Sequence, residues 1–229
     1  IFSSLIEFTT NALYNRGDIE FIYTFPNEFS FPGFLKLIGW QLFGELNLYV
    51  KPLNLFSTVK GFIKSLKKGL TASERSEINS NFLYWNNIAS IYMEKDEFSI
   101  INKFSSEFDN FWNSLKNNYN ICLKRDSIYL NWRYIDNPQR DRYLILGYRI
   151  DKEIKGYIVL KKEILFNCTS GIIVDILSAN NKVADSLIKE ALRIFKGENL
   201  TISGFAGIPS KDINIALKKN GYFMVPRRF

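Results

Sequence analysis

Histidine is absent from the 229 residues of the chain, and cysteine occurs only twice, at Cys122 and Cys168. Without histidine the chain cannot build a Ser-His-Asp triad, a Cys-His pair or a histidine-ligated metal site, and we expect no metal. Two cysteines are too few for the disulfide framework of a small secreted domain, so we expect a cytoplasmic location. Any proton transfer must use carboxylates, tyrosine, lysine or water.

Long apolar runs are also absent. None reaches the roughly 18 residues of a membrane-spanning helix, and the longest, such as residues 172–177, have the length of strands. Residue 1 is Ile and no signal peptide follows it, so we expect a piece of a longer protein. The sequence lacks zinc-finger spacing, a homeodomain-like helix and an RNA-binding aromatic motif, which argues against nucleic acid as a partner.

The chain is rich in apolar residues and in positive charge. Hydrophobic residues make up 46% of it, which is enough for a packed core. The net charge of +7 favours an anionic partner, which leaves open a nucleic acid, a membrane surface or a phosphorylated small molecule. Part of that charge crowds one segment, and a solvated linker helix is the simplest explanation for Lys60, Lys64, Lys67 and Lys68.

Helical and strand-like periods alternate along the chain and predict an α/β fold. The spacing of apolar residues predicts helices at residues 1–16, 30–38, 58–68, 98–115, 126–135, 183–195 and 211–220. Short β-rich runs predict strands at residues 19–25, 40–50, 142–150, 154–161, 162–178, 200–205 and 222–225.

The first and last segments of the chain have the same expected order of elements, helix, strand and short helix. Residues 4–6 (Ser-Leu-Ile) recur at 186–188, and Gly39-Trp40 falls on Gly221-Tyr222, at a common offset of 182 residues (186 − 4 and 221 − 39). Matched spacing of several elements indicates an internal duplication.

The duplication divides the chain into three parts. Residues 1–57 are expected to form the C-terminal half of a first unit, and residues 58–80 a basic connector. Residues 81–229 are expected to form a second unit that is cut short at its C-terminus.

The order of elements in residues 81–229 resembles the GNAT superfamily of N-acetyltransferases, and the whole chain resembles a fragment of a tandem-domain member. The resemblance implies an α/β fold (an α+β mixed sheet) of tandem N-acyltransferase-like units, the first incomplete. It also implies binding of acetyl-CoA or another acyl-CoA. In this family a strand leads through a glycine-rich turn into a long helix, whose N-terminus binds the pyrophosphate.

The chain departs from the family at two places. The turn at residues 177–184 reads Leu-Ser-Ala-Asn-Asn-Lys-Val-Ala, and the lack of glycine hinders close approach of the backbone to a pyrophosphate. Leu35 and Leu217 stand where many members have a tyrosine that protonates the leaving thiolate.

These departures place the acyl-CoA site in the first copy. There the resemblance assigns Asn27, at a strand end, and Phe34 to the pantetheine arm of the cofactor. Alternatively, Asn27 caps a turn and Phe34 belongs to the core.

The acceptor site is expected in the second copy. The cluster Trp132-Arg133-Tyr134 falls near the family's acceptor groove, where tryptophan can stack on a cation and arginine can pair with phosphate or carboxylate. A structural helix end is the alternative. Asp175, inside an apolar strand, is the candidate catalytic base, unless it is simply hydrogen-bonded at a sheet edge.

The resemblance predicts an acyl-CoA-dependent N-acyltransferase that acts on an amine of a small molecule, an amino sugar or a peptide. Two alternatives stay open at this point. One is a non-catalytic scaffold or acceptor-binding module. The other is a transferase that uses aminoacyl-tRNA, for which the lysine-rich segment is the only indication.

Overall fold

The structure, a computed structural model, describes residues 2–67 apart from 20, 21, 25, 28, 38, 43 and 45, and residues 80–85, 97–119 and 122–225. It divides into two compact units, residues 1–45 (unit 1) and residues 46–229 (unit 2). Among the described residues, none of the helices is both long and apolar enough to cross a membrane.

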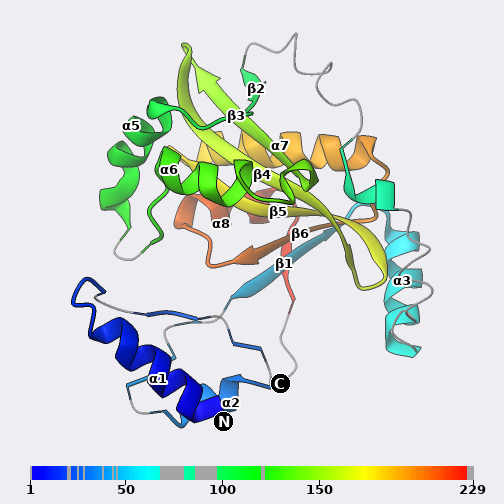
Figure 1. Cartoon of the computed structure of the whole chain (residues 1–229). Helices are drawn as coiled ribbons and strands as arrows, with labels where there is room; N and C mark the ends of the chain where they lie inside the picture. Colours follow the sequence, from blue (N-terminus) through cyan, green and yellow to red (C-terminus); the bar gives the residue numbers. More distant parts are fainter. Residues whose placement is uncertain are drawn as a thin grey trace. The chain divides into compact units, whose positions relative to one another are not determined.

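Unit 2 contains a seven-stranded sheet with the order β2-β3-β4-β5-β6-β1-β7 (Figure 1). Its strands are β1 (Asn47–Pro52), β2 (Phe98–Ile100), β3 (Tyr143–Ile150), β4 (Glu153–Leu165), β5 (Cys168–Ser178), β6 (Ile202–Gly207) and β7 (Phe223–Met224). Neighbouring strands are antiparallel except β5 and β6, which are parallel. The mixed, mainly antiparallel sheet predicted from the sequence is therefore confirmed.

Helices cover both faces of this sheet, as predicted (Figure 1). The helices of unit 2 are α3 (Leu55–Lys67), α5 (Ser106–Leu115), α6 (Ser127–Leu130), α7 (Asn181–Gly197) and α8 (Lys211–Lys219). Shorter turns are the 3-10 helices η1 (Ser80–Leu83), η3 (Lys116–Asn118) and η5 (Arg140–Arg142) and the π-helix η4 (Asn131–Ile135). One core lies between the sheet and α7 with α8, and a second lies between the sheet and α5 with α6.

Helix α7 joins the two parallel strands, as a right-handed crossover requires. Its apolar stripe includes Leu187, Ala191 and Phe195, which are fully buried, and burial of each large side chain contributes about 2 kcal/mol. The Phe195 ring lies directly over Gly171 of β5, where a Cβ atom would come within 2.3 Å of the ring. Only glycine allows the helix to pack this closely on the strand.

Several predicted boundaries were wrong. The apolar spacing over 98–115 predicted one helix, but Phe98–Ile100 pairs with β3, and the helix starts only at Ser106. The run 162–178 is not one strand, because Phe166 and Asn167 form a left-handed turn between β4 and β5. In the run 40–50 only residues from Asn47 onward form a strand.

Unit 1 contains helix α1 (Phe2–Tyr14) and the short helix α2 (Phe31–Leu35). The predicted strand at 19–25 is not formed by the described residues of that range. The Phe34 ring packs between Phe2 and Trp40, with ring centroids 5.3 and 4.7 Å away. Aromatic packing thus holds the two helices together without a sheet.

The left-handed residues that follow the helices share the offset of the proposed duplication. Gly17 and Gly39 follow α1 and α2 with positive φ, and Asn199 and Gly221 follow α7 and α8 in the same way. Both pairs are related by 182 residues (199 − 17 and 221 − 39). The helices themselves end at offsets of 183 and 184 residues (197 − 14 and 219 − 35), and the described residues of 19–25 do not form the strand that the match requires. The duplication therefore stays a prediction.

Candidate functional site

Asp175 follows an irregularity in the pairing of β4 and β5. Val159 is opposite Asp175 and Leu160 is opposite Ile173, so that Val174 is an extra residue without a partner on β4. Such a bulge re-aims the side chain that follows it. The Asp175 carboxylate lies among tyrosines on the face of the sheet that α5 and α6 cover.

The Asp175 carboxylate is held by donors on both of its oxygen atoms. The Tyr157 and Tyr134 hydroxyls donate to Oδ2 over 3.0 and 3.3 Å. The Ile176 amide donates to Oδ1 over 2.9 Å, and the Arg125 guanidinium contacts Oδ1 over 3.4 Å. Both carboxylate oxygens already accept hydrogen bonds, which leaves little room for a substrate group to reach them. The arrangement therefore suits an anchoring group better than a general base.

The groups around Asp175 keep their protons. Burial, and then the Asp175 charge, raise the pKa of the Tyr134 and Tyr157 hydroxyls far above the ordinary value. Burial alone would lower the pKa of Arg125, but the Asp175 carboxylate outweighs it and the pKa is raised. Arg125 therefore stays charged, and the two phenols stay neutral, across the physiological pH range.

The π-helix η4 delivers two of the predicted acceptor residues to this cluster. Arg133 Nε donates to the Tyr134 hydroxyl over 3.0 Å, and that hydroxyl donates to Asp175. Single π-turns are found mostly at functional sites. The third predicted residue, Trp132, points elsewhere: 64% of it is exposed, and its ring lies 5.8 Å from that of Tyr129.

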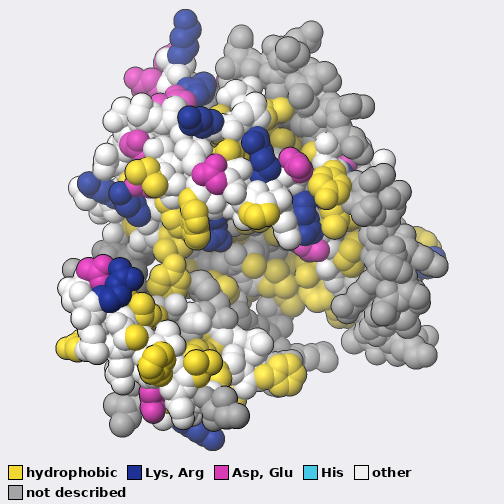
Figure 2. All heavy atoms as spheres, in the orientation of Figure 1, with side chains coloured by type: hydrophobic (Ala, Val, Ile, Leu, Met, Phe, Trp, Pro, Cys, Tyr) yellow, Lys and Arg dark blue, Asp and Glu magenta, His cyan; other side chains and the backbone are white. Residues whose placement is uncertain are grey.

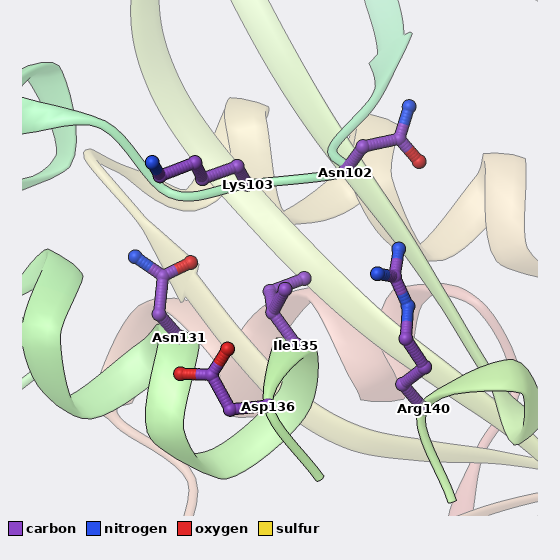
Figure 3. A pocket seen from close by; sticks show the side chains of 6 residues that line it. All are labelled: Asn102, Lys103, Asn131, Ile135, Asp136 and Arg140. Atoms are coloured by element: carbon purple, nitrogen blue, oxygen red, sulfur yellow. The ribbon is translucent and has the colours of Figure 1, made fainter. Parts of the chain in front are cut away.

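The other side of η4 lines a pocket of about 500 Å³ (Figure 3). Its walls carry two cations, one carboxylate and two amides, supplied by Asn102, Lys103, Asn131, Ile135, Asp136 and Arg140. The Asn131 amide is already used, because it exchanges two hydrogen bonds with the Phe104 backbone. Lys103, Asp136 and Arg140 are the charged groups left to meet a polar molecule.

Strands β5 and β6 stay paired only over part of their length. Their ladder runs from Ser170 and Ile202 to Ile173 and Phe205. Beyond Ile173, β5 continues to Ser178 with no described partner on the β6 side. The Ile176 amide of this edge already donates to Asp175 Oδ1, and the other main-chain groups of residues 174–178 that do not pair with β4 can bind an extended ligand with amide groups.

The start of helix α7 is occupied by its own side chain. Asn180 Oδ1 accepts hydrogen bonds from the amides of Lys182 and Val183, at 3.0 and 3.1 Å. Free amides at a helix start would attract a pyrophosphate. Here the cap satisfies two of them, in addition to the lack of glycine in this turn.

The two residues predicted to contact a cofactor in the first copy have local partners. Asn27 Oδ1 accepts from the amides of Phe29 and Ser30, which fixes the turn before α2. Phe34 lies between the rings of Phe2 and Trp40. Asn27 thus caps a turn, and Phe34 is only half-buried, so the assignment of both residues to a cofactor stays a prediction.

Sequence reasoning missed Arg125, Tyr157 and Asn180. Tyr157 was within reach, because the strand period places it on the same face as Val159, diagonal to Asp175. Nothing in the sequence distinguishes Arg125 from other surface arginines. Among the described residues, no group of acidic or cysteine side chains could hold a metal ion.

No family model and no curated protein matches the chain. Among solved structures, the chain is similar to Saccharomyces cerevisiae N-myristoyltransferase with bound myristoyl-CoA, at 13% identity over 79% of this chain and 48% of that one, with a TM-score of 0.47. It is also similar to a ribosomal-protein-alanine N-acetyltransferase from Brucella melitensis biovar Abortus 2308, at 14% identity over 58% and 99%, with a TM-score of 0.40. A probable acetyltransferase matches at 16% identity over 58% and 92%, again with a TM-score of 0.40.

These similarities concern the arrangement of elements and not a substrate. The sheet of unit 2 has one parallel pair joined by a helix, with antiparallel strands on either side. The mixed sheet of unit 2, with helices on both of its faces, has the α/β character that the sequence predicted.

Proposed function

We propose that the protein transfers an acyl group from a CoA thioester to an amine. The observation that carries this proposal is the unpaired edge of β5 next to the bulge at Val174. An extended peptide acceptor, with its main-chain amides, can pair with such an edge as an added strand would. Holding the acceptor amine close to the thioester would supply most of the catalysis that this reaction needs.

In this proposal unit 2 binds the acceptor, and the tight binding site for the cofactor lies elsewhere. The Asn180 cap removes two amides from pyrophosphate binding, so we expect unit 2 to bind CoA weakly. Acetyl-CoA or another acyl-CoA is assigned to the first copy, with Asn27 and Phe34 as the residues on its arm. Both side chains would have to exchange their present contacts for the ligand.

The acceptor is proposed to be an amine-bearing small molecule, amino sugar or peptide that enters the pocket of Figure 3. Asp136 would meet the amine, and Lys103 with Arg140 would meet an anionic group of the same molecule. Asp175 would act by positioning Tyr134 and Arg133 behind the pocket. Such chemistry fits the cytoplasmic location expected from the cysteine content.

Thiol release tests the reaction. Acetyl-CoA is incubated with the protein and a panel of amines, and free CoA is measured against a blank, because the exposed Cys122 also reacts with thiol reagents. Amine-dependent release that falls in Asp136→Asn supports the proposal. Absence of release from the full-length protein with every amine, together with absence of CoA binding, would overturn it.

A second candidate function is a non-catalytic acceptor-binding unit. It is favoured by the saturated Asp175 carboxylate and by Leu217, which is fully buried and carries no proton. In that case an amine would bind in the pocket, but neither this chain nor the full-length protein would acylate it. The alternative that uses aminoacyl-tRNA rests on the lysines of α3, whose surroundings favour a different partner.

A further inference from the structure

Helix α3 packs on the sheet through its small side chains. Gly61 approaches the β4–β5 turn so closely that a Cβ atom there would lie 2.2 Å from Cys168 Sγ. The Cys168 thiol contacts the Ser57 carbonyl, and the Thr58 hydroxyl, which donates to the Asn54 carbonyl over 2.7 Å, also lies 3.3 Å from the Thr201 carbonyl. Ser57, Thr58 and Gly61 therefore form the docked face of α3, next to the β4–β5 turn (Figure 1).

The opposite face of α3 is apolar and faces outward. Leu55, Phe56, Val59 and Ile63 recur at helical spacing, and 73%, 80%, 54% and 47% of each residue is exposed. The Phe62 ring packs in a T-shaped arrangement with that of Phe166, and Phe62 is still 48% exposed. A helix of a soluble domain normally buries its apolar stripe. The apolar stripe of α3 instead faces away from the sheet.

The sequence of this helix carries positive charge and no negative charge. Residues 55–67 include three lysines and no acidic residue, and another lysine follows at position 68. Lys60 is exposed beside Val59. On the face of unit 2 shown in Figure 2, by contrast, acidic and basic side chains are interspersed among the described residues.

We propose that α3 is a docking surface for an anionic lipid bilayer, with its apolar stripe inserted among the acyl chains. Aliphatic and aromatic side chains flanked by lysines are the composition of helices that lie in a membrane interface. The charge complementarity is with lipid headgroups, which attract each nearby lysine. A nucleic acid would satisfy the lysines but would leave the leucine, valine and isoleucine in contact with phosphate and water.

The surface would hold the mixed sheet of unit 2 against a membrane. The docked face of α3 is fixed by Gly61 and Thr58, so the helix does not need to refold to present its stripe. The inference is independent of the proposed reaction, because none of these residues belongs to the pocket or to the Asp175 cluster.

Vesicle co-sedimentation of the chain tests this inference. Vesicles contain phosphatidylcholine alone or with about 30% phosphatidylglycerol, and salt is raised from about 50 to about 500 mM. We expect binding to the anionic vesicles that weakens with salt, and little binding to the neutral ones. Phe56→Ser with Ile63→Ser should weaken binding at least about tenfold, and each lysine replaced by glutamine about fivefold.

The matched control replaces two exposed isoleucines elsewhere, Ile128→Ser with Ile215→Ser, and should bind like the native chain. Circular dichroism checks that all variants keep their helix content. Absence of vesicle binding, or equal binding by the Phe56/Ile63 variant, would overturn the proposal. A second result would also overturn it: the native chain does not bind vesicles but dimerises or binds tRNA, and the Phe56/Ile63 variant abolishes that dimerisation or tRNA binding. The apolar stripe would then be the docking surface for that partner.

Discussion

The Tyr157 hydroxyl lies 3.0 Å from Oδ2 of Asp175, and the tyrosine is completely buried in the sheet. The Tyr157 hydroxyl on β4 thus donates a hydrogen bond to the Asp175 carboxylate, which lies on β5 inside the core. This pair explains how a charged residue is tolerated inside an apolar strand, because its oxygen atoms are matched by donors.

Replacing Tyr157 by phenylalanine should therefore destabilise the protein by about 1–3 kcal/mol, because the buried carboxylate loses one of its donors. Urea unfolding followed by circular dichroism measures the change. Tyr148→Phe on β3, where the ring packs 4.9 Å from that of Phe98, is the control and should cost less. Equal losses for the two variants would mean that the Tyr157 hydroxyl does not support Asp175.

Asp185 should make the stability depend on pH in the acidic range. Burial raises its pKa, but hydrogen bonds from Lys219, Lys189 and Asn220 outweigh this and lower the pKa to about 2. The folded pKa lies below the ordinary value of 3.8, so the stabilisation is complete above pH 4 and is lost as the pH falls through 2.

The measurement is the free energy of unfolding of the native chain and of Asp185→Asn between pH 7 and pH 2. The native chain should be more stable than the variant at pH 7, and the difference in their free energies of unfolding should shrink as the pH falls toward 2. A constant difference for Asp185→Asn would contradict the assignment of these ion pairs.

Removing the Asn180 cap should improve CoA binding by unit 2. Asn180→Gly frees the amides of Lys182 and Val183 at a cost of only a few tenths of a kcal/mol in helix capping. We expect weak or undetectable CoA binding to the native chain by calorimetry and a gain of at least about tenfold in the variant, since anions are favoured at free helix N-termini.

Two comparisons sharpen the CoA experiment. Pantetheine lacks the pyrophosphate, so its affinity should not change with Asn180→Gly. Tight binding of CoA to the native chain that Lys182→Ala abolishes and Asn27→Ala leaves intact would show that the cofactor site belongs to the second copy instead.

Residues 55–229 alone should be much less stable than the whole chain. Strand β1 lies between β6 and β7 and pairs with both, and Tyr49 and Val50 are buried on its two faces. Without β1, two strand edges and part of each core become exposed to water. Thermal unfolding should show the loss, and a synthetic peptide of residues 46–54 should restore stability. Equal melting temperatures with and without residues 1–54 would refute this.

The sequence predicted the main elements of unit 2 because their periods are strong. Helix α7 and strand β5 carry uninterrupted apolar patterns that local propensity supports. Prediction from the sequence failed where tertiary contacts decide between helix and strand. Phe98–Ile100 continues the period of the helix after it, yet pairs with β3, and no local signal reveals such a choice.

The candidate site was predicted in part for the same reason. Arg133, Tyr134 and Asp175 were found because aromatic, basic and acidic residues stand out in apolar surroundings. That a π-turn would bring Tyr134 to a strand some 41 positions away could not be inferred from spacing. Arg125 and the Asn180 cap depend on the fold of the backbone around them.

The position of β1 also sets the order in which the chain can fold as it is synthesised. Its neighbour β6 begins 155 residues later (202 − 47), so β1 leaves the ribosome without a partner. At about 5–20 residues per second it waits on the order of ten to thirty seconds, with its backbone and apolar side chains exposed. Pairing over such a sequence separation is slow. Nascent chains of this protein should therefore depend on chaperones until β6 and β7 emerge, and strand β1 is the segment that those chaperones would shield.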